Sequence, residues 1–380
     1  MDFDLTEDQQ LFRDTARRFL QSECPVDKVR ALAEQPAGFD RDWWRRAAEL
    51  GWMTLLVDEA HGGVGLGAQG PVYLGIVAEE MGRLVSPGPV LASSIVAAAL
   101  SRASNADIHS DTTARLASGE IIAAWCLAEG DRASQPSSVA LKAERTATGY
   151  RLTGLKTPVE AGAEADVLLV TAMGDGGLIQ LLVPGDAKGV SIECLEGLDL
   201  VRRHARITFD GVEVADAAMV GDASSAVADV EHQMQLALTL QSAESSGAAE
   251  RVFEFTLEWM FDRYSFGRPL ASYQALKHRF ADMKSWIEGC HAISSAAIRA
   301  VGAGDPLAAQ FARAAKSYVS DRTPEIVQDC VQMHGGIGVT WDHDIHLYLR
   351  RVASNRLLYG GPADTREQIA ALLLAEAGEA

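Results

Sequence analysis

Two short segments in the last third of the chain combine residue types that could bind an anionic cofactor. In the first, RYSFGRPL, Arg263 could pair with a pyrophosphate through two hydrogen bonds, and Phe266 could pack on a flat ring. In the second, QMHGGIG, the adjacent Gly335 and Gly336 would let the backbone approach a ligand closely. Each segment, taken singly, is equally consistent with a helix cap followed by a turn.

The elements that must position these segments change in periodicity along the chain. Residues 1–118 carry apolar side chains at helical spacing, as in Phe12 and Ala16. Residues 119–225 show short apolar runs bounded by Gly, Pro and Asp, which are typical of strands. Residues 226–380 return to helical spacing. We therefore expect an α+β fold in which these stretches form an N-terminal helical domain, a central β-sandwich or barrel, and a C-terminal four-helix bundle.

The helices of the expected bundle follow from the positions of proline. No proline occurs between Val227 and Arg263, which predicts one long helix. Three further helices are expected over residues 274–302, 306–321 and 324–335, because a proline opens each of the last two. The RYSFGRPL segment would then lie between two helices, and the QMHGGIG segment at a helix end.

Composition disfavours several classes of function. The formal net charge is −18 and no basic stripe is evident, which argues against binding to nucleic acid. No apolar run approaches the roughly 20 residues of a membrane span. The acidic, amphipathic start, MDFDLTEDQQLF, does not have the composition of a signal peptide. We therefore expect a cytoplasmic protein.

Neither the cysteines nor the histidines predict a metal site. The five cysteines are scattered and show no C-x-x-C pair, so neither a disulfide framework nor a zinc site is expected. His343 and His346 have a spacing that could suggest a metal, but no other residue nearby completes a ligand set. The carboxylates beside them are better placed to cap the following helix.

The RYSFGRPL and QMHGGIG segments begin 69 residues apart, at Arg263 and Gln332, and we call them the nucleotide-type segments. Together they resemble the corresponding segments of the acyl-CoA dehydrogenase family. The pair of motifs R-x-x-F-G and Q-x-x-G-G-x-G, and the order helical–β–helical, carry the resemblance. It covers nearly the whole chain, with further matching segments LTEDQ at residues 5–9, ELGW at 49–52, GGVG at 62–65 and AEEMG at 78–82.

The resemblance implies a tetrameric flavoprotein that binds FAD at subunit interfaces and passes electrons to an electron-transfer flavoprotein. The implied reaction is α,β-dehydrogenation of an acyl-CoA thioester, in which a carboxylate removes the α proton and the β hydrogen leaves as a hydride. The residues assigned to FAD by the resemblance are Arg263, Phe266 and Gln274 of one subunit and Gln332, Gly335 and Gly336 of its neighbour.

The catalytic base is where this chain departs from the family. The family's usual base position, in a Tyr-Glu-Gly-type segment, holds Gly360, and a second known position holds Ala237. Glu244 lies seven residues after Ala237, nearly two helical turns, so it shares that helix face at a distance of roughly 10 Å. Glu244 is therefore the candidate base. The alternative is a structural carboxylate paired with an arginine or a hydroxyl group.

The segment that cradles the flavin ring also departs from the family. A Trp-x-Thr pattern is replaced by Pro158-Val159-Glu160, and a carboxylate at Glu160 would be unfavourable beside a reduced, anionic flavin. Such losses resemble a bacterial branch in which catalytic and non-catalytic subunits form heterotetramers that act on sterol side-chain or other bulky acyl-CoA esters. The alternatives are a non-catalytic scaffold subunit of the same fold and a flavin-dependent monooxygenase on that fold.

Overall fold

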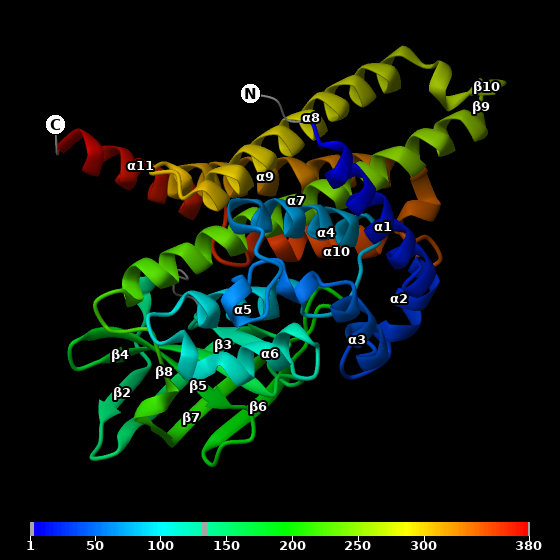
Figure 1. Ribbon diagram of the computed structural model, residues 1–380. Coiled ribbons are helices and arrows are strands. Elements are labelled where there is room, and N and C mark those ends of the chain that lie inside the picture. Colours follow the sequence, from blue (N-terminus) through cyan, green and yellow to red (C-terminus); the bar gives the residue numbers. More distant parts are fainter. Residues whose placement is uncertain (1–3, 131–134, 379–380) are drawn as a thin grey trace.

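The computed structural model describes residues 4–130 and 135–378, and its N-terminal part is helical as expected (Figure 1). The first helix begins with a capping box: the Thr6 hydroxyl accepts from the Gln9 amide at 3.3 Å, while the Gln9 side chain accepts from the Thr6 amide at 3.1 Å. The helices of this part are α1 (Glu7–Glu23), α2 (Val26–Ala33), α3 (Arg41–Glu49), α4 (Gly70–Arg83), α5 (Val90–Arg102) and α6 (Ser110–Ala117).

The central part is one mixed sheet, with strands in the order β6-β7-β3-β2-β4-β5-β8, and β1 paired in parallel with β4. The long strands β3 and β7 are antiparallel over most of their length. The strands are β1 (Ala123–Cys126), β2 (Lys142–Arg145), β3 (Gly149–Glu160), β4 (Val167–Gly174), β5 (Gly177–Pro184), β6 (Val190–Leu195), β7 (His204–Ala215) and β8 (Met219–Val220). A β region between two helical ones confirms the expected fold class.

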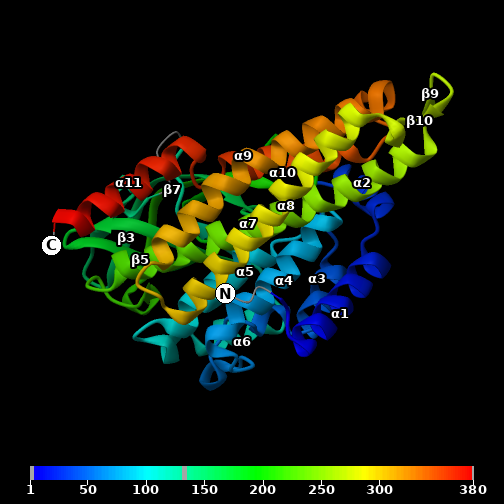
Figure 2. The ribbon, with the colours of Figure 1, turned by 90° about the horizontal axis from the view of Figure 1, so that it is seen from above.

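The C-terminal part is a bundle of long helices that lies across the rest of the chain (Figures 1 and 2). A short hairpin, β9 (Tyr264–Ser265) with β10 (Arg268–Pro269), joins the first two helices at one end of the bundle. The helices are α7 (Ala226–Asp262), α8 (Gln274–Ala303), α9 (Ala308–His334), α10 (Ile345–Leu357) and α11 (Pro362–Gly378). Within the described residues, none of the helices combines the length and apolarity needed to cross a membrane.

The bundle differs from expectation at Pro324, which does not end a helix but lies inside α9. A proline in a helix interior removes one hydrogen bond, here the one to the carbonyl of Ser320. Thr323 and Pro324 are buried in the bundle, and α9 packs against both α7 and α8. Tertiary packing therefore overrides the local preference for a break, and one helix replaces the two that were predicted.

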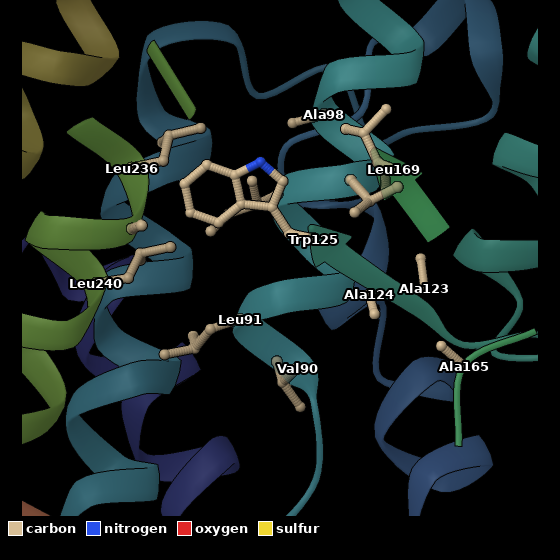
Figure 3. Close-up of a cluster of buried hydrophobic side chains, with 14 of the residues drawn as sticks. Val90, Leu91, Ala98, Ala123, Ala124, Trp125, Ala165, Leu169, Leu236 and Leu240 are labelled. Carbon is tan, nitrogen blue, oxygen red and sulfur yellow. The ribbon is translucent and has the colours of Figure 1, made fainter. Parts of the chain in front are cut away.

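A hydrophobic core joins the sheet to the N-terminal helices and to the first half of α7 (Figure 3). Trp125 of β1 lies between Leu91 of α5 and the α7 residues Leu236 and Leu240. Its indole nitrogen donates to the Gln233 side chain at 2.9 Å, so the one polar atom of this large side chain is satisfied. The α7 helix is thus fixed against the sheet over its first four turns.

Helices α4 and α7 touch through their backbones at two glycines. A Cβ atom on Gly82 would lie 1.9 Å from the carbonyl oxygen of Glu244, and one on Gly247 would lie 2.1 Å from the carbonyl oxygen of Glu79. Real atoms cannot approach that closely, so neither position has room for a side chain. The crossing therefore fixes where Glu244 enters the interior.

We predict that Gly247→Ala lowers the free energy of unfolding by roughly 2 kcal/mol, because the new methyl group must push α4 away from α7. Chemical denaturation measures the change. The matched control is Gly176→Ala, since a Cβ at Gly176 meets nothing within 4 Å. Equal stability of the two variants would show that the crossing is looser than the structure indicates.

Candidate functional site

Glu244 is fully buried in the middle of α7, and both of its carboxylate oxygens are occupied. Arg202 donates to the two oxygens at 2.7 and 2.8 Å, as a bidentate pair. Arg351 of α10 donates to Oε1 at 2.8 Å, and the side-chain amide of Asn355 donates to Oε2 at 2.8 Å. The carboxylate therefore accepts four hydrogen bonds from three side chains.

Two further carboxylates complete what we call the central ion cluster, namely Glu160, Asp199, Arg202, Glu244 and Arg351. Glu160, at the end of β3, lies 3.2 Å from Nε of Arg202, and Asp199 pairs with Arg351. Asp199 also accepts from the backbone amides of Val201 and Arg202 at 3.0 and 2.9 Å. The cluster thus connects the sheet region with α7 and α10.

The charges of the cluster decide which carboxyl groups are ionised. Burial opposes ionisation of Glu244, but Arg202 and Arg351 outweigh it and hold its pKa below the usual value. Burial likewise opposes ionisation of Asp199, but Arg351 and Arg202 lower its pKa to about 2. For Glu160 burial prevails over the attraction of Arg202 and raises the pKa. Three carboxyl groups face two guanidinium groups, and Glu160 is the one that most readily stays protonated.

This geometry argues against the prediction that Glu244 is the catalytic base. A carboxylate that removes the α proton of an acyl-CoA must be accessible to the substrate and must have a pKa raised toward neutrality. Glu244 has the opposite properties, because it is enclosed, fully hydrogen-bonded and held in its ionised form. The structure supports the alternative, a structural carboxylate paired with arginine.

The polar network continues from the cluster into the bundle through a buried lysine. Lys316 of α9 is almost fully buried, and its amine donates to the Gln241 side chain and to the backbone carbonyl of Asn355. Burial lowers the pKa of Lys316 to about 7. Among the described residues no carboxylate pairs with this amine, so its environment favours the neutral form.

A cavity of 440 Å³ lies beside the cluster, between the sheet and the junction of α10 with α11. We call it the Tyr359 pocket. It brings together Pro158, in the segment expected to cradle a flavin ring, and Gly360, at the expected base position. The remaining lining residues include Ala128, Gly130, Leu195, His204, Leu357, Leu358 and Tyr359, with Glu196 and Asp364 at exposed positions. No enclosed carboxylate is among the described lining residues.

The two nucleotide-type segments lie at the same end of the bundle and are linked by Trp259. Its ring lies 5.8 Å from the Arg263 guanidinium and stacks on the His334 ring at 5.3 Å. Phe266, at the turn of the β9–β10 hairpin, is 97% exposed and has a positive φ of 50°. Gly335, with φ of 65°, caps the C-terminal end of α9 and begins a short 3₁₀ helix over Gly335–Val339.

The other predicted cofactor residues are equally open to solvent. Gln274 and Gln332 are exposed, and a Cβ atom on either Gly335 or Gly336 would meet nothing within 4 Å. The α10 helix, 13 residues and about 20 Å long, begins near the nucleotide-type segments and ends at the Tyr359 pocket. Binding roles for these residues stay predictions.

One cluster of possible metal ligands occurs among the described residues, outside the site. Glu79, Glu250 and His291 have ligand atoms within 4.8 Å of one another. Glu250 also pairs with Arg83 at 2.8 Å, and His291 lies 3.4 Å from each of the two carboxylates. Burial lowers the pKa of His291, but its hydrogen bonds with Glu250 and Glu79 outweigh burial and raise the pKa to about 10. The imidazole is therefore a cation, and its positive charge offsets the negative charge of the two carboxylates. We assign no metal to this cluster.

Several residues of the site were not identified from sequence. Arg202 and Asn355 reach Glu244 only through the fold, because they lie far from it in the sequence. Asp199 and Lys316 belong to the same network, through Arg351 and through the backbone carbonyl of Asn355. Arg351 could have been singled out, since it lies eight residues before Tyr359, but Arg350 was an equal candidate. The structure separates the two, because Arg351 is buried and Arg350 is not.

Comparisons with known proteins agree with this architecture. The family model "Acyl-CoA dehydrogenase, N-terminal domain" matches residues 6–120, and "Acyl-CoA dehydrogenase, C-terminal domain" matches residues 230–374. The chain is 27% identical to acyl-CoA dehydrogenase IpdE2 of Mycolicibacterium smegmatis, over 96% of this chain and 97% of that protein. It is 29% identical to acyl-CoA dehydrogenase FadE27 of Mycobacterium tuberculosis, over 95% of each.

Among solved structures, the chain is similar to one chain of the ChsE4-ChsE5 complex from Mycobacterium tuberculosis. The TM-score is 0.88 and the identity 27%, over 98% of this chain and 99% of that one. The chain is similar to the same degree, with the same coverage, to a structure described as the Tcur3481-Tcur3483 steroid ACAD G363A variant.

We predict that Glu244→Gln lowers the free energy of unfolding by about 3–5 kcal/mol, because two buried guanidinium groups lose their shared anion. Urea denaturation measures the change. The matched control is Glu258→Gln, an exposed glutamate on the same helix. A variant as stable as the control would mean that Glu244 is not a structural anion.

The buried amine gives a prediction with a defined pH dependence. Because the pKa of Lys316 is about 7 in the folded chain and near 10.4 when unfolded, the unfolded state binds more protons between these values. Burial of the charged amine therefore lowers the free energy of unfolding by its full amount below pH 7. This loss of stability disappears as the pH rises to about 10. Lys316→Met should gain stability relative to the wild type at pH 7, and this difference should fall by about 1.4 kcal/mol per pH unit.

Denaturation of both proteins at several pH values measures this difference. The control is Lys277→Met at an exposed position of α8. A difference that does not vary with pH would contradict the inference that burial favours the neutral amine.

Proposed function

The chain belongs to the acyl-CoA dehydrogenase family of FAD-dependent oxidoreductases, and we propose that it takes part in α,β-dehydrogenation of an acyl-CoA as the supporting subunit of a heteromer. In this assembly a second chain of the same fold supplies the catalytic base. The substrate class that we propose is a bulky or branched acyl-CoA.

The observation that carries the proposal is the central ion cluster. The two positions at which the family places its base hold Ala237 and Gly360, neither of which can accept a proton. The one carboxylate on the same face of α7, Glu244, is enclosed by Arg202 and Arg351. Side chains thus fill the interior behind the Tyr359 pocket, and the two carboxylates among its described lining residues, Glu196 and Asp364, are exposed to solvent.

The nucleotide-type end of the bundle fits a role in holding FAD. The Arg263 guanidinium has a ring contact with Trp259 and is otherwise exposed, so it is available to pair with a pyrophosphate. Phe266 extends into solvent, and Gly335 and Gly336 leave open space where a side chain would block a ligand. The chemistry that FAD supplies in this family is uptake of a hydride from the acyl β-carbon. These residues of the chain bind and orient the cofactor at a subunit interface.

The heteromeric assembly and the substrate class are supported by similar proteins. The two solved structures at 27% identity are each described as a pair of different chains, and one of them as a steroid enzyme. A chain that contributes to FAD binding but has no base is suited to such a pair. An electron-transfer flavoprotein is the acceptor that the family implies.

The proposal predicts a difference between the chain alone and the chain with its partner. Purified by itself and supplied with FAD, the chain should not reduce a dye with acyl-CoA, because no base removes the α proton. Co-expression with a neighbouring gene product of the same family should give a yellow complex that reduces the dye.

In that complex, Arg263→Ala should lower the flavin content, whereas Arg206→Ala on an exposed part of β7 should not. Flavin absorbance per chain and dye reduction are the two measurements. Dye reduction by the chain alone, at a rate equal to that of the complex, would contradict the supporting role.

A further inference from the structure

The two nucleotide-type segments are joined by a pair of stacked rings. Trp259 lies one helical turn before Arg263, at the end of α7, and its backbone carbonyl accepts from the Arg263 amide at 2.9 Å. His334 is the last residue of α9 and directly precedes Gly335. The two rings lie 5.3 Å apart with an interplanar angle of 21°. The stack therefore connects the ends of two long helices at the places where the proposed cofactor residues begin.

The His334 ring has a fixed orientation. Its Nδ1 atom lies 2.9 Å from the backbone carbonyl of Cys330, and because a carbonyl oxygen only accepts, Nδ1 carries the proton and donates. Burial lowers the pKa of His334, which favours the neutral imidazole. The ring is thus buried, uncharged and hydrogen-bonded to its own helix, and it gives the Trp259 indole a rigid surface to pack on.

The Arg263 guanidinium, by contrast, has little else to orient it. It lies 5.8 Å from the centre of the Trp259 ring, and no carboxylate among the described residues pairs with it. An exposed arginine without a partner samples many rotamers, and ordering such a side chain on binding costs free energy. The Trp259 ring reduces this cost, because an aromatic face attracts the cation and restricts its position.

We propose that Trp259 is a positioning residue, whose ring, supported by His334, holds the Arg263 guanidinium ready for the diphosphate group of a dinucleotide. The inference depends on the proposed function, since it takes this end of the bundle as part of the FAD site. Trp259 acts through Arg263 and is not required to contact the ligand. Loss of its ring leaves the arginine in the chain but unordered, so the diphosphate binds more weakly.

The test measures binding of ADP, as a probe for the diphosphate, to the full chain by isothermal titration calorimetry. Arg263→Ala should weaken binding about tenfold, because a charged hydrogen-bond donor is lost. Trp259→Leu keeps an apolar side chain but has no ring, and it should weaken binding about fivefold. Trp259→Phe, which keeps a ring, should restore most of the affinity.

A double variant separates positioning from a general structural role. If Trp259 acts through Arg263, Trp259→Leu should have no further effect on ADP binding once Arg263 has been replaced by alanine. A merely structural role would weaken ADP binding by the same factor with and without the arginine.

The matched control is a second stack of the same composition. The Trp341 ring stacks on His346 at 4.4 Å and lies 5.6 Å from the Arg350 guanidinium. His346 and Arg350 both belong to α10, so this stack does not connect the two nucleotide-type segments. Trp341→Leu should therefore leave ADP binding unchanged.

Unchanged ADP binding by Trp259→Leu would overturn the inference, as would an equal loss in Trp341→Leu or the same factor in the presence and absence of Arg263. These results would contradict only the positioning role. If Arg263→Ala leaves ADP binding unchanged, or if the wild type does not bind ADP at millimolar concentration, the FAD-binding role of this end fails, and the inference fails with it. The two kinds of failure are thus distinguishable.

Discussion

The structure depends on one interaction, the pairing of the buried Glu244 carboxylate with the guanidinium groups of Arg202 and Arg351. Charged groups in an interior are tolerated only when each has partners, and here every oxygen of Glu244 is satisfied. The three side chains come from the segment before β7, from α7 and from α10. Arg351 also donates to the carbonyl of Ser86 at 3.2 Å, which ties in the loop after α4. One ion cluster therefore joins all three parts of the chain.

Under the proposed function, this cluster occupies the part of the interior in which a catalytic chain would hold its base. In an enzyme of this family the interior beside the flavin has to accommodate an acyl group and a carboxylate that can take up a proton. Here the same interior holds the five ionisable side chains of the central ion cluster, and Lys316 extends the network between α9 and α10. Under the proposed function, such a filled interior contributes to specific packing rather than to catalysis. The nucleotide-type end of the bundle lies about 20 Å away, at the other end of α10.

The sequence predicted the order of the elements well, because apolar periodicity differs strongly between its three stretches. It predicted α7 and α8 almost to the residue, since Pro269 and the absence of proline in α7 leave few alternatives. It was wrong at Pro324, where packing against two helices outweighs the missing hydrogen bond. It singled out Glu244 as a candidate base, but the side chains that occupy this carboxylate include Arg202 and Asn355, which lie 42 and 111 residues away. Contacts at such separations leave no periodic pattern in a single sequence.

The account's central claim, that Glu244 is a permanently ionised structural anion, is tested most directly by infrared spectroscopy. Difference spectra of the ¹³C-glutamate-labelled wild type and a variant without this carboxyl group isolate its vibrations. The account predicts a carboxylate band of constant intensity between about pH 5 and pH 8. A protonated carboxyl band that grows with a midpoint near pH 6–7 would contradict it, because that behaviour belongs to a poised base.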